Sequence, residues 1–354
     1  MAGTTAGLDA PSVAAVDASS QFADATGLPE QLRDAAWKVE SAGIDPFDAP
    51  GGVIVAGMGG SAIGGLLARA AIGDRASRPI GVVRGYELPG WATPDTAVLC
   101  SSYSGDTEET LACYEAAGAL GAPRIVATTG GRLAELARGD GVPIIPVAGG
   151  YQPRAAVAYM TVAALEVAAL AGAAPSVRSE VDVAASHAEA LVAEWGPDGA
   201  EDNLAKALAR ELAGTVPLVY GSGVTVPVAY RWKTQLNENA KMHAFFHELP
   251  ELDHNEIVGW SGAQDGVPWA AVFLDDAYLH PRARQRIALT CELIEPAAQA
   301  VQVVQTRGET PTERVISLVL LGDLVSLYVA VLRGVDPQPV EVIERLKVEL
   351  GQPQ

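Results

Sequence analysis

The sequence predicts an α/β protein made of two similar domains, each a doubly wound parallel sheet. Three observations predict this fold class. The chain has 354 residues, which suits two domains of ordinary size. Apolar runs of strand length alternate with helical patterns along most of the chain, as in parallel sheets whose two faces are covered by helices. A strand, glycine turn and helix near residue 53 also recur near residue 217, which indicates an internal duplication.

The N-terminal half begins with about fifty residues of predicted helical lead-in. Within it, Leu28, Leu32, Ala36 and Val39 lie near helical spacing with polar residues between them. Strands are expected in the segments that follow, most of them with a loop and a helix behind: 51–73, 79–89, 96–121, 123–141 and 142–150.

One or two connecting helices are expected in the middle of the chain, over 155–174 and 176–196. The first is long enough to span a bilayer, but Glu166 interrupts it and alanine and glycine dominate it, so we expect a buried helix. We place the two domains at 1–190 and 191–354.

The second domain is expected to repeat the plan of the first. The segment 203–214 is a predicted helix, and 216–242 again has the pattern of strand, glycine loop and helix. Further strands are expected in 269–276 and 297–306, and helices in 314–334 and 339–350. A ligand site is expected between the halves, at the C-terminal ends of their strands.

The charge and cysteine content of the chain limit which kinds of ligand and partner it can bind. The formal charge is −19, from 24 Lys and Arg against 43 Asp and Glu, and such a surface repels nucleic acid and anionic lipid. Small anions are not excluded, because backbone amides and hydroxyls bind phosphate locally. Cys100, Cys113 and Cys291 are scattered and odd in number, which indicates neither a disulfide framework nor a zinc cluster. We expect a cytoplasmic protein with a small-molecule ligand.

The glycine-rich stretch Gly57–Ala62 follows the first predicted strand. Glycines let the backbone turn sharply and approach a ligand, and the next helix offers free amides. The stretch formally fits the dinucleotide pattern G-x-G-x-x-G/A, but a dinucleotide site also expects an acidic residue at the end of the second strand. That strand ends in Arg84-Gly85. A nicotinamide or flavin site and a ligand-free turn are the alternatives here to an anion site.

A second polar loop holds three hydroxyl groups around a glycine. Ser102, Ser104 and Thr107 follow an apolar strand and precede a predicted helix. Hydroxyl donors together with unpaired helix amides make a phosphate cradle that needs no lysine. The alternative is an ordinary helix cap with an acidic first turn.

The densest polar stretch runs from Gln235 to Asn255. Glu238 is predicted on a continuing helix, where a carboxylate base and a nearby histidine could move a proton. On the same helix His243 and His247 would share a face and could be a metal pair, although the glutamate of H-E-x-x-H is missing. An interdomain polar seam is the remaining alternative.

Four segments together resemble the bifunctional phosphoglucose/phosphomannose isomerase branch of the sugar isomerase (SIS) family. They are GMGGSAIGG at 57–65, SSYSGDTEET at 101–110, QLNENAK at 235–241 and PELDHN at 250–255. The resemblance implies SIS-type domains and interconversion of glucose 6-phosphate or mannose 6-phosphate with fructose 6-phosphate through a cis-enediol. It implies neither a metal nor a redox cofactor.

The resemblance also implies residue roles. The sugar cleft would be lined by Gly59, Gly60 and Ser61, and the 6-phosphate would be held by Ser102, Ser104 and Thr107. Glu238 would be the base, Arg154 would stabilise the enediolate, and Lys347 would assist ring opening. His254 would open the ring and is expected to reach in from the partner subunit of a homodimer.

Two features depart from the family pattern or lie outside it. Asp106 stands where the family usually has asparagine, and we expect it to cap the helix that the loop opens and to face away from the phosphate. The resemblance gives His243 and His247 no role. The rival function is a non-catalytic sugar-phosphate sensor on the same fold, which would keep the hydroxyl loop but could lose Glu238, His254 or Arg154.

Overall fold

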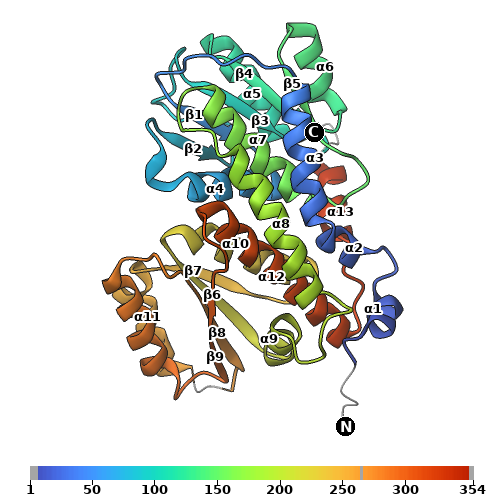
Figure 1. Cartoon of the computed structure of the whole chain (residues 1–354), viewed down its shortest axis with the longest axis vertical. Coiled ribbons are helices and arrows are strands. Elements are labelled where there is room, and N and C mark those ends of the chain that lie inside the picture. The colour runs from blue at the N-terminus through green and yellow to red at the C-terminus, as the bar shows by residue number, and fades with distance from the viewer. Residues whose placement is uncertain (1–6, 264–265, 351–354) are drawn as a thin grey trace.

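The computed structural model describes residues 7–263 and 266–350. It contains two parallel sheets with a layer of helices between them (Figure 1). The first sheet has the order β2-β1-β3-β4-β5 and the second the order β7-β6-β8-β9. Every strand pairing in both sheets is parallel. The two-domain α/β fold expected from the sequence is therefore confirmed.

The strand bounds are β1 Val53–Ala56, β2 Ile80–Val83, β3 Ala97–Ser101, β4 Arg124–Thr128, β5 Ile144–Pro146, β6 Val216–Ser222, β7 Phe245–Leu249, β8 Trp269–Asp275 and β9 Ala300–Gln305. The helix bounds are α1 Ala10–Val16, α2 Gln21–Thr26, α3 Leu28–Ser41, α4 Gly59–Ile72, α5 Glu108–Leu120, α6 Gly131–Asp140, α7 Val157–Leu170, α8 Arg178–Trp195, α9 Leu204–Leu212, α10 Val226–Glu238, α11 Pro281–Ile294, α12 Pro311–Arg333 and α13 Glu341–Leu350. Short 3₁₀ turns are η1 Gly73–Arg75, η2 Gly223–Thr225, η3 Glu251–His254 and η4 Glu256–Gly262.

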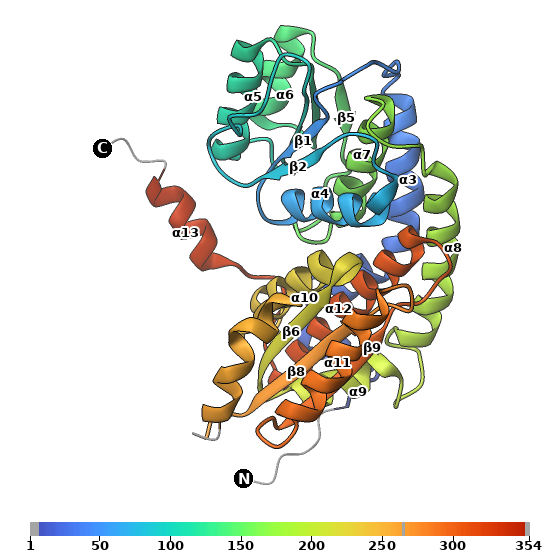
Figure 2. The same ribbon diagram turned by 90° about the vertical axis from the view of Figure 1, so that its left-hand side faces the viewer.

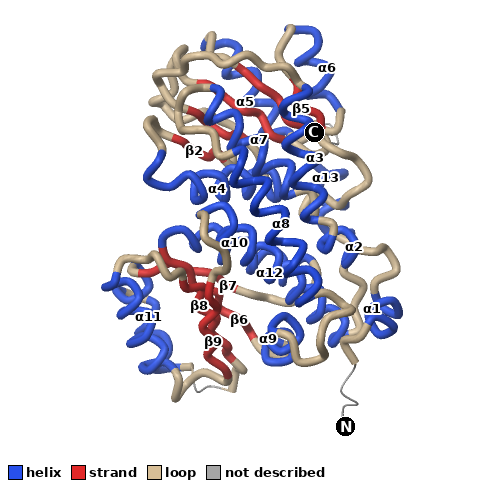
Figure 3. The backbone as a smooth tube through the Cα atoms, in the orientation of Figure 1, coloured by secondary structure: helices blue, strands red, loops and turns tan. Residues whose placement is uncertain are grey.

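The duplication seen in the sequence is a duplication of topology. β1 and β6 are the first strands of their sheets in the chain, and each lies between the next two strands, β1 between β2 and β3 and β6 between β7 and β8. Each is followed by a helix, α4 or α10, and these two helices pack against each other between the sheets (Figure 3). The C-terminal ends of β1 and β6 therefore lead directly into paired helices at the centre of the molecule.

The helical layer carries most of the core. α7 is buried along nearly its whole length and packs on α4, so closely that a Cβ on Gly64 would lie 2.4 Å from the Met160 Cβ. α12 is long and apolar enough to cross a membrane, but 94% of its most apolar stretch is buried in the protein. α12 is therefore a core helix of the protein. The expectation that 155–174 contains a buried helix is met by α7.

The N-terminal helices do not belong to one half alone. α3 packs against α7 and α8, whereas α1 and α2 pack against α12, with the Phe22 and Tyr328 rings 4.9 Å apart. α8 spans residues 178–195, so a division at residue 190 falls inside it. The domain bounds thus stay a prediction, because α8 is shared between the halves.

The prediction that the helix continues through the polar stretch after Gln235 is wrong. α10 ends at Glu238, and the chain then makes a tight turn with Lys241 at φ +51° before β7 begins at Phe245. Asn237 supports the turn by donating from its side-chain amide to the Met242 carbonyl at 2.8 Å. β7 then pairs with β6, so His247 lies in a strand, His243 lies in the turn before it, and the pair does not share a helix face.

Candidate active site

The hydroxyl loop lies at the C-terminal end of β3, as predicted. The Ser102 and Thr107 hydroxyl oxygens are 2.8 Å apart, and the Gly105 amide donates to Ser102 Oγ at 3.0 Å. Ser102 is buried and Ser104 is exposed, so the loop presents hydroxyls at two depths. Thr107 precedes α5 but makes no capping hydrogen bond to it. The side chains therefore organise the loop, and the first-turn amides of α5 are not spent on the Thr107 hydroxyl.

Asp106 points at a neighbouring helix. Its Oδ1 accepts a 2.9 Å hydrogen bond from the Arg132 amide, in the first turn of α6. Backbone packing fixes this arrangement, because a Cβ on Gly105 would lie 1.9 Å from the Gly130 carbonyl oxygen. The carboxylate caps α6, as a negative group at a helix N-terminus should.

The glycine loop contacts both the start of the hydroxyl loop and the segment that carries Arg154. A Cβ on Gly57 would lie 2.7 Å from the Ser101 carbonyl oxygen, at the start of the hydroxyl loop. A Cβ on Gly60 would lie 2.7 Å from the Pro153 carbonyl oxygen and 3.3 Å from the Arg154 Cα. Gly59 has φ +49° and opens α4, whose N-cap side chain makes no hydrogen bond to it. Ser61 is buried in the first turn of α4.

Arg154 is the buried cation of the site, with only 5% of its side chain exposed. Its Nε donates to Asn239 Oδ1 at 2.7 Å, and its Nη2 donates to the Pro337 carbonyl at 2.8 Å. Burial lowers the pKa of the Arg154 guanidinium from its usual value, and the Glu238 carboxylate opposes that shift. An arginine starts from so high a pKa that it keeps its charge here.

Glu238 faces Arg154 across a gap that is too long for a hydrogen bond. Arg154 Nη1 and Glu238 Oε2 are 3.6 Å apart, and the Glu238 side chain is 32% exposed. A groove of about 750 Å³ opens beside Glu238, between the C-terminal end of α10 and residues 339–343. A carboxylate that is partly exposed in a groove, next to a fixed cation, can exchange a proton with a ligand there.

Lys241 adds a second cation beside this groove. Its Nζ donates to the Glu238 carbonyl at 2.5 Å and to the Pro337 carbonyl at 2.9 Å. Burial, followed by the charge of Arg154, lowers the pKa of Lys241. Both cations therefore hold the segment that leads into α13.

His254 and Lys347 are not brought to this cluster within one chain. His254 ends η3 and is exposed, and Lys347 lies on α13, which projects from the body of the molecule (Figure 2). In the described residues neither side chain makes a hydrogen bond or ion pair with Arg154 or Glu238. One chain thus unites the glycine loop, the hydroxyl loop, Arg154 and Glu238, and leaves these two residues outside.

Comparison with known proteins identifies the family. Residues 201–350 match the family described as the bacterial phospho-glucose isomerase C-terminal SIS domain. The bifunctional phosphoglucose/phosphomannose isomerase of Caldicellulosiruptor bescii is 38% identical over 341 residues, covering 94% of this chain and 99% of the relative. The chain belongs to the bifunctional phosphoglucose/phosphomannose isomerase family.

Another member of the family agrees with that assignment, and a solved structure shows the same fold. The bifunctional phosphoglucose/phosphomannose isomerase of Aquifex aeolicus is 33% identical, covering 89% of this chain and 94% of the relative. A glucose-6-phosphate isomerase like protein of Thermus thermophilus has the same fold, with a TM-score of 0.62, 23% identity and coverage of 97% and 99%.

Sequence reasoning missed three groups that hold the site of this phosphoglucose/phosphomannose isomerase family member together. They are the Asn239 side chain, the Lys241 ammonium and the Pro337 carbonyl. A signal for Asn239 was available, since it directly follows Glu238. The position of the Lys241 ammonium depends on a left-handed turn, and the Pro337 carbonyl belongs to a segment nearly one hundred residues downstream. No local sequence pattern predicts either one.

Proposed function

We propose that this protein interconverts glucose 6-phosphate, mannose 6-phosphate or both with fructose 6-phosphate. Membership in a family of bifunctional isomerases supports the reaction class, and four polar features in contact with one another support it in this chain. The hydroxyl loop touches the glycine loop, the glycine loop touches Arg154, and Arg154 faces Glu238.

Each feature has a role in an aldose–ketose isomerisation. Ser102, Ser104 and Thr107, with the first-turn amides of α5, bind the 6-phosphate. Gly59, Gly60 and Ser61 line the cleft that the sugar occupies. The net charge of −19 makes such local binding important, because the chain as a whole does not attract a phosphate.

The proton transfer is assigned to Glu238. After ring opening, its carboxylate removes the proton from C2 of the aldose, and the C2–H electron pair forms the C1–C2 double bond of a cis-enediolate. As that double bond forms, the C1 carbonyl π pair moves to O1, which then takes up the proton that leaves O2. The protonated Glu238 returns its proton to C1 while O2 becomes the C2 carbonyl oxygen, which gives the ketose, and the reverse steps give the aldose. Arg154 Nη1 faces the carboxylate and stabilises the negative charge on the enediolate oxygens.

The 3.6 Å approach of the buried Arg154 to Glu238, which itself lines the open groove, carries the proposal. A sugar-phosphate sensor on the same fold needs the hydroxyl loop but has no use for this pair. The test is a coupled assay of fructose 6-phosphate formation from each aldose 6-phosphate. Turnover of either substrate supports the isomerase, and binding of both without turnover would replace it with the sensor.

We also propose a cytoplasmic homodimer, with His254 and Lys347 completing the site. Exposed apolar side chains on α13 support a second chain at this surface, since Val342, Leu346 and Leu350 are 83%, 57% and 62% exposed. Light scattering on the purified protein measures the mass in solution, and a monomer at assay concentration would overturn this part of the proposal.

A further inference from the structure

Arg154 distributes its nitrogens over different partners. Nε donates to Asn239 Oδ1 at 2.7 Å, and Nη2 donates to the Pro337 and Gln338 carbonyls at 2.8 and 3.3 Å. Among the residues that the structure describes, the one polar contact of Nη1 is the ion pair with Glu238 at 3.6 Å. Two nitrogens therefore hold the guanidinium in place, and the third is directed at the proposed base.

The orientation of the Asn239 amide is fixed by its other partner. Asn239 Nδ2 donates to Ser326 Oγ at 2.9 Å, and Ser326 Oγ donates onward to the Asp323 carbonyl at 2.7 Å. Since the serine proton is used in that second bond, Ser326 accepts from Asn239, and the amide oxygen must face Arg154. Asn239 is 2% exposed and Ser326 is fully buried, so water does not compete for these bonds.

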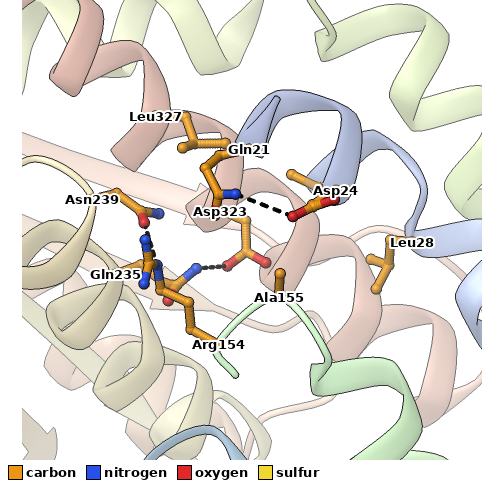
Figure 4. A pocket seen from close by; sticks show the side chains of 10 residues that line it. Gln21, Asp24, Leu28, Arg154, Ala155, Gln235, Asn239, Asp323 and Leu327 are labelled. Atoms are coloured by element: carbon orange, nitrogen blue, oxygen red, sulfur yellow. Dashed lines mark hydrogen bonds between the residues drawn. The ribbon is translucent and has the colours of Figure 1, made fainter. Parts of the chain in front are cut away.

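The backbone of Arg154 is held by a second buried arrangement, of which Figure 4 shows the Gln235 and Asp323 side chains. Arg231 Nη2 donates to the Arg154 carbonyl at 2.9 Å and pairs with Asp323 Oδ2 at 2.7 Å. Gln235 adds a 3.0 Å hydrogen bond to Asp323 Oδ1. The small cavity behind Arg154, about 20 Å³, has room for about one water molecule. Because the Arg154 backbone is fixed, the direction of its guanidinium depends on the groups that hydrogen-bond to the guanidinium.

We propose that Asn239 is a positioning residue that directs Arg154 Nη1 toward Glu238 and toward the developing enediolate. Asn239 follows Glu238 in the chain and caps α10, so the base and the group that aims the arginine are fixed to the same helix end. The amide is neutral, so it orients the guanidinium without neutralising the charge that the enediolate needs. This inference rests on the proposed isomerase function.

The test is a double-mutant cycle on kcat for fructose 6-phosphate formation. Asn239→Leu keeps the size of the side chain and removes both hydrogen bonds, and we expect kcat to fall about 30-fold while KM changes less than about three-fold. If Asn239 acts through Arg154, the same substitution in an Arg154→Ala background should change kcat less than about three-fold. Equal losses of kcat in both backgrounds would overturn the proposal.

Asn203→Ala is the matched control. Asn203 is also a buried asparagine, but it caps α9 by accepting from the Lys206 amide at 3.1 Å. The Asn203→Ala substitution should lower the melting temperature by a few degrees and leave kcat unchanged. A similar loss of kcat in this control would show that stability alone explains the effect.

Ser326→Ala covers the case in which the leucine variant does not fold. It removes only the partner of the Asn239 amide nitrogen, so we expect a smaller fall in kcat, about five-fold, that also disappears without Arg154. Full activity of a folded Asn239→Leu or Ser326→Ala variant overturns the inference. The proposed function fails separately, if the unsubstituted protein does not isomerise either aldose phosphate.

Discussion

Gly60 at the start of α4 lies against the backbone of Pro153, so that a Cβ at position 60 would lie 2.7 Å from the Pro153 carbonyl oxygen. The same Cβ would lie 3.3 Å from the Arg154 Cα. This contact joins the glycine loop to the segment that carries the buried cation. Because residue 60 has no side chain, the backbone of Pro153 and Arg154 can pack against the start of α4, and this contact fixes the position of the Arg154 Cα.

Gly60→Ala should therefore move the Arg154 backbone. We expect a loss of about 1–3 kcal/mol of stability and a fall in kcat of at least ten-fold. Thermal unfolding and steady-state kinetics measure the two effects. Gly139→Ala is the matched control, since Gly139 lies in α6 with no atom within 4 Å of an added Cβ, and it should be neutral or slightly stabilising. A fully active Gly60→Ala protein would contradict the close contact.

Glu238→Gln should abolish turnover and leave phosphate binding intact. The amide cannot accept the C2 proton, so kcat should fall by about a thousand-fold or more, whereas the affinity for inorganic phosphate should stay within about two-fold. Kinetics and calorimetric titration provide the two numbers. Glu211→Gln, on the exposed face of α9, should leave both unchanged. Turnover near the unsubstituted rate would remove Glu238 from the role of base.

The sequence predicted the fold well because its signals are local. The two strand–glycine–helix units at β1–α4 and β6–α10 lie where the pattern placed them. The miss was β7, where the pattern was interpreted as a continuing helix. Its five residues form a strand by pairing with β6, after a turn in which Lys241 adopts φ +51°. A left-handed lysine has no composition signal, because it is selected by its tertiary contacts.

The site was predictable in parts. Ser102 and Gly60 follow apolar strands, so their places at the sheet edge follow from the topology. The contact of Arg154 with Glu238 spans 84 positions and depends on how the two halves pack, which no local pattern encodes. The same is true of the Pro337 carbonyl, which binds both Arg154 and Lys241.

Ser102→Ala should weaken phosphate binding more than catalysis. Ser102 Oγ organises the loop through Thr107 Oγ1 and the Gly105 amide, at 2.8 and 3.0 Å. We expect the KM for sugar phosphates to rise about ten-fold or more with a smaller change in kcat. Ser186→Ala, on the exposed part of α8, is the control and should change neither value. An unchanged KM would remove the loop from the phosphate site.

Mixed dimers should test whether His254 acts across subunits. Glu238→Gln and His254→Ala should each inactivate the homodimer, because each removes a proton-transfer group from both sites. If the two residues of one site come from different chains, a dimer of one variant with the other has one intact site. Refolding the two variants together should then restore up to about a quarter of the activity, since half of the dimers are mixed and each has one working site. No recovery from dimers shown to be mixed would place His254 and Glu238 of one site in the same chain.

A carboxylate at the junction of the two halves makes stability depend on pH. Glu180 of α8 accepts hydrogen bonds from Arg75, which follows α4, and from Thr312 of α12 at 2.7 Å. Burial raises the pKa of Glu180, but the hydrogen bonds and charge of Arg75 and the hydrogen bond from Thr312 outweigh burial and leave the pKa below its usual value. A lowered carboxyl pKa in the folded state means that folding favours the charged form.

The stabilisation from Glu180 is therefore present above its unfolded pKa, about 4.3, and is lost as the pH falls through the lower folded pKa. Glu180→Gln should cost about 1 kcal/mol at pH 7, a modest value because Arg75 is one-third exposed and solvent screens the pair. Denaturant unfolding at pH 7 and at about pH 3 should show the variant and the unsubstituted protein converging at the lower pH. Glu349→Gln breaks an exposed pair with Arg345 on α13 and should cost less than about 0.5 kcal/mol. If the difference in unfolding free energy between Glu180→Gln and the unsubstituted protein stays constant from pH 7 to pH 3, Glu180 stabilises the fold through its shape and not through its charge.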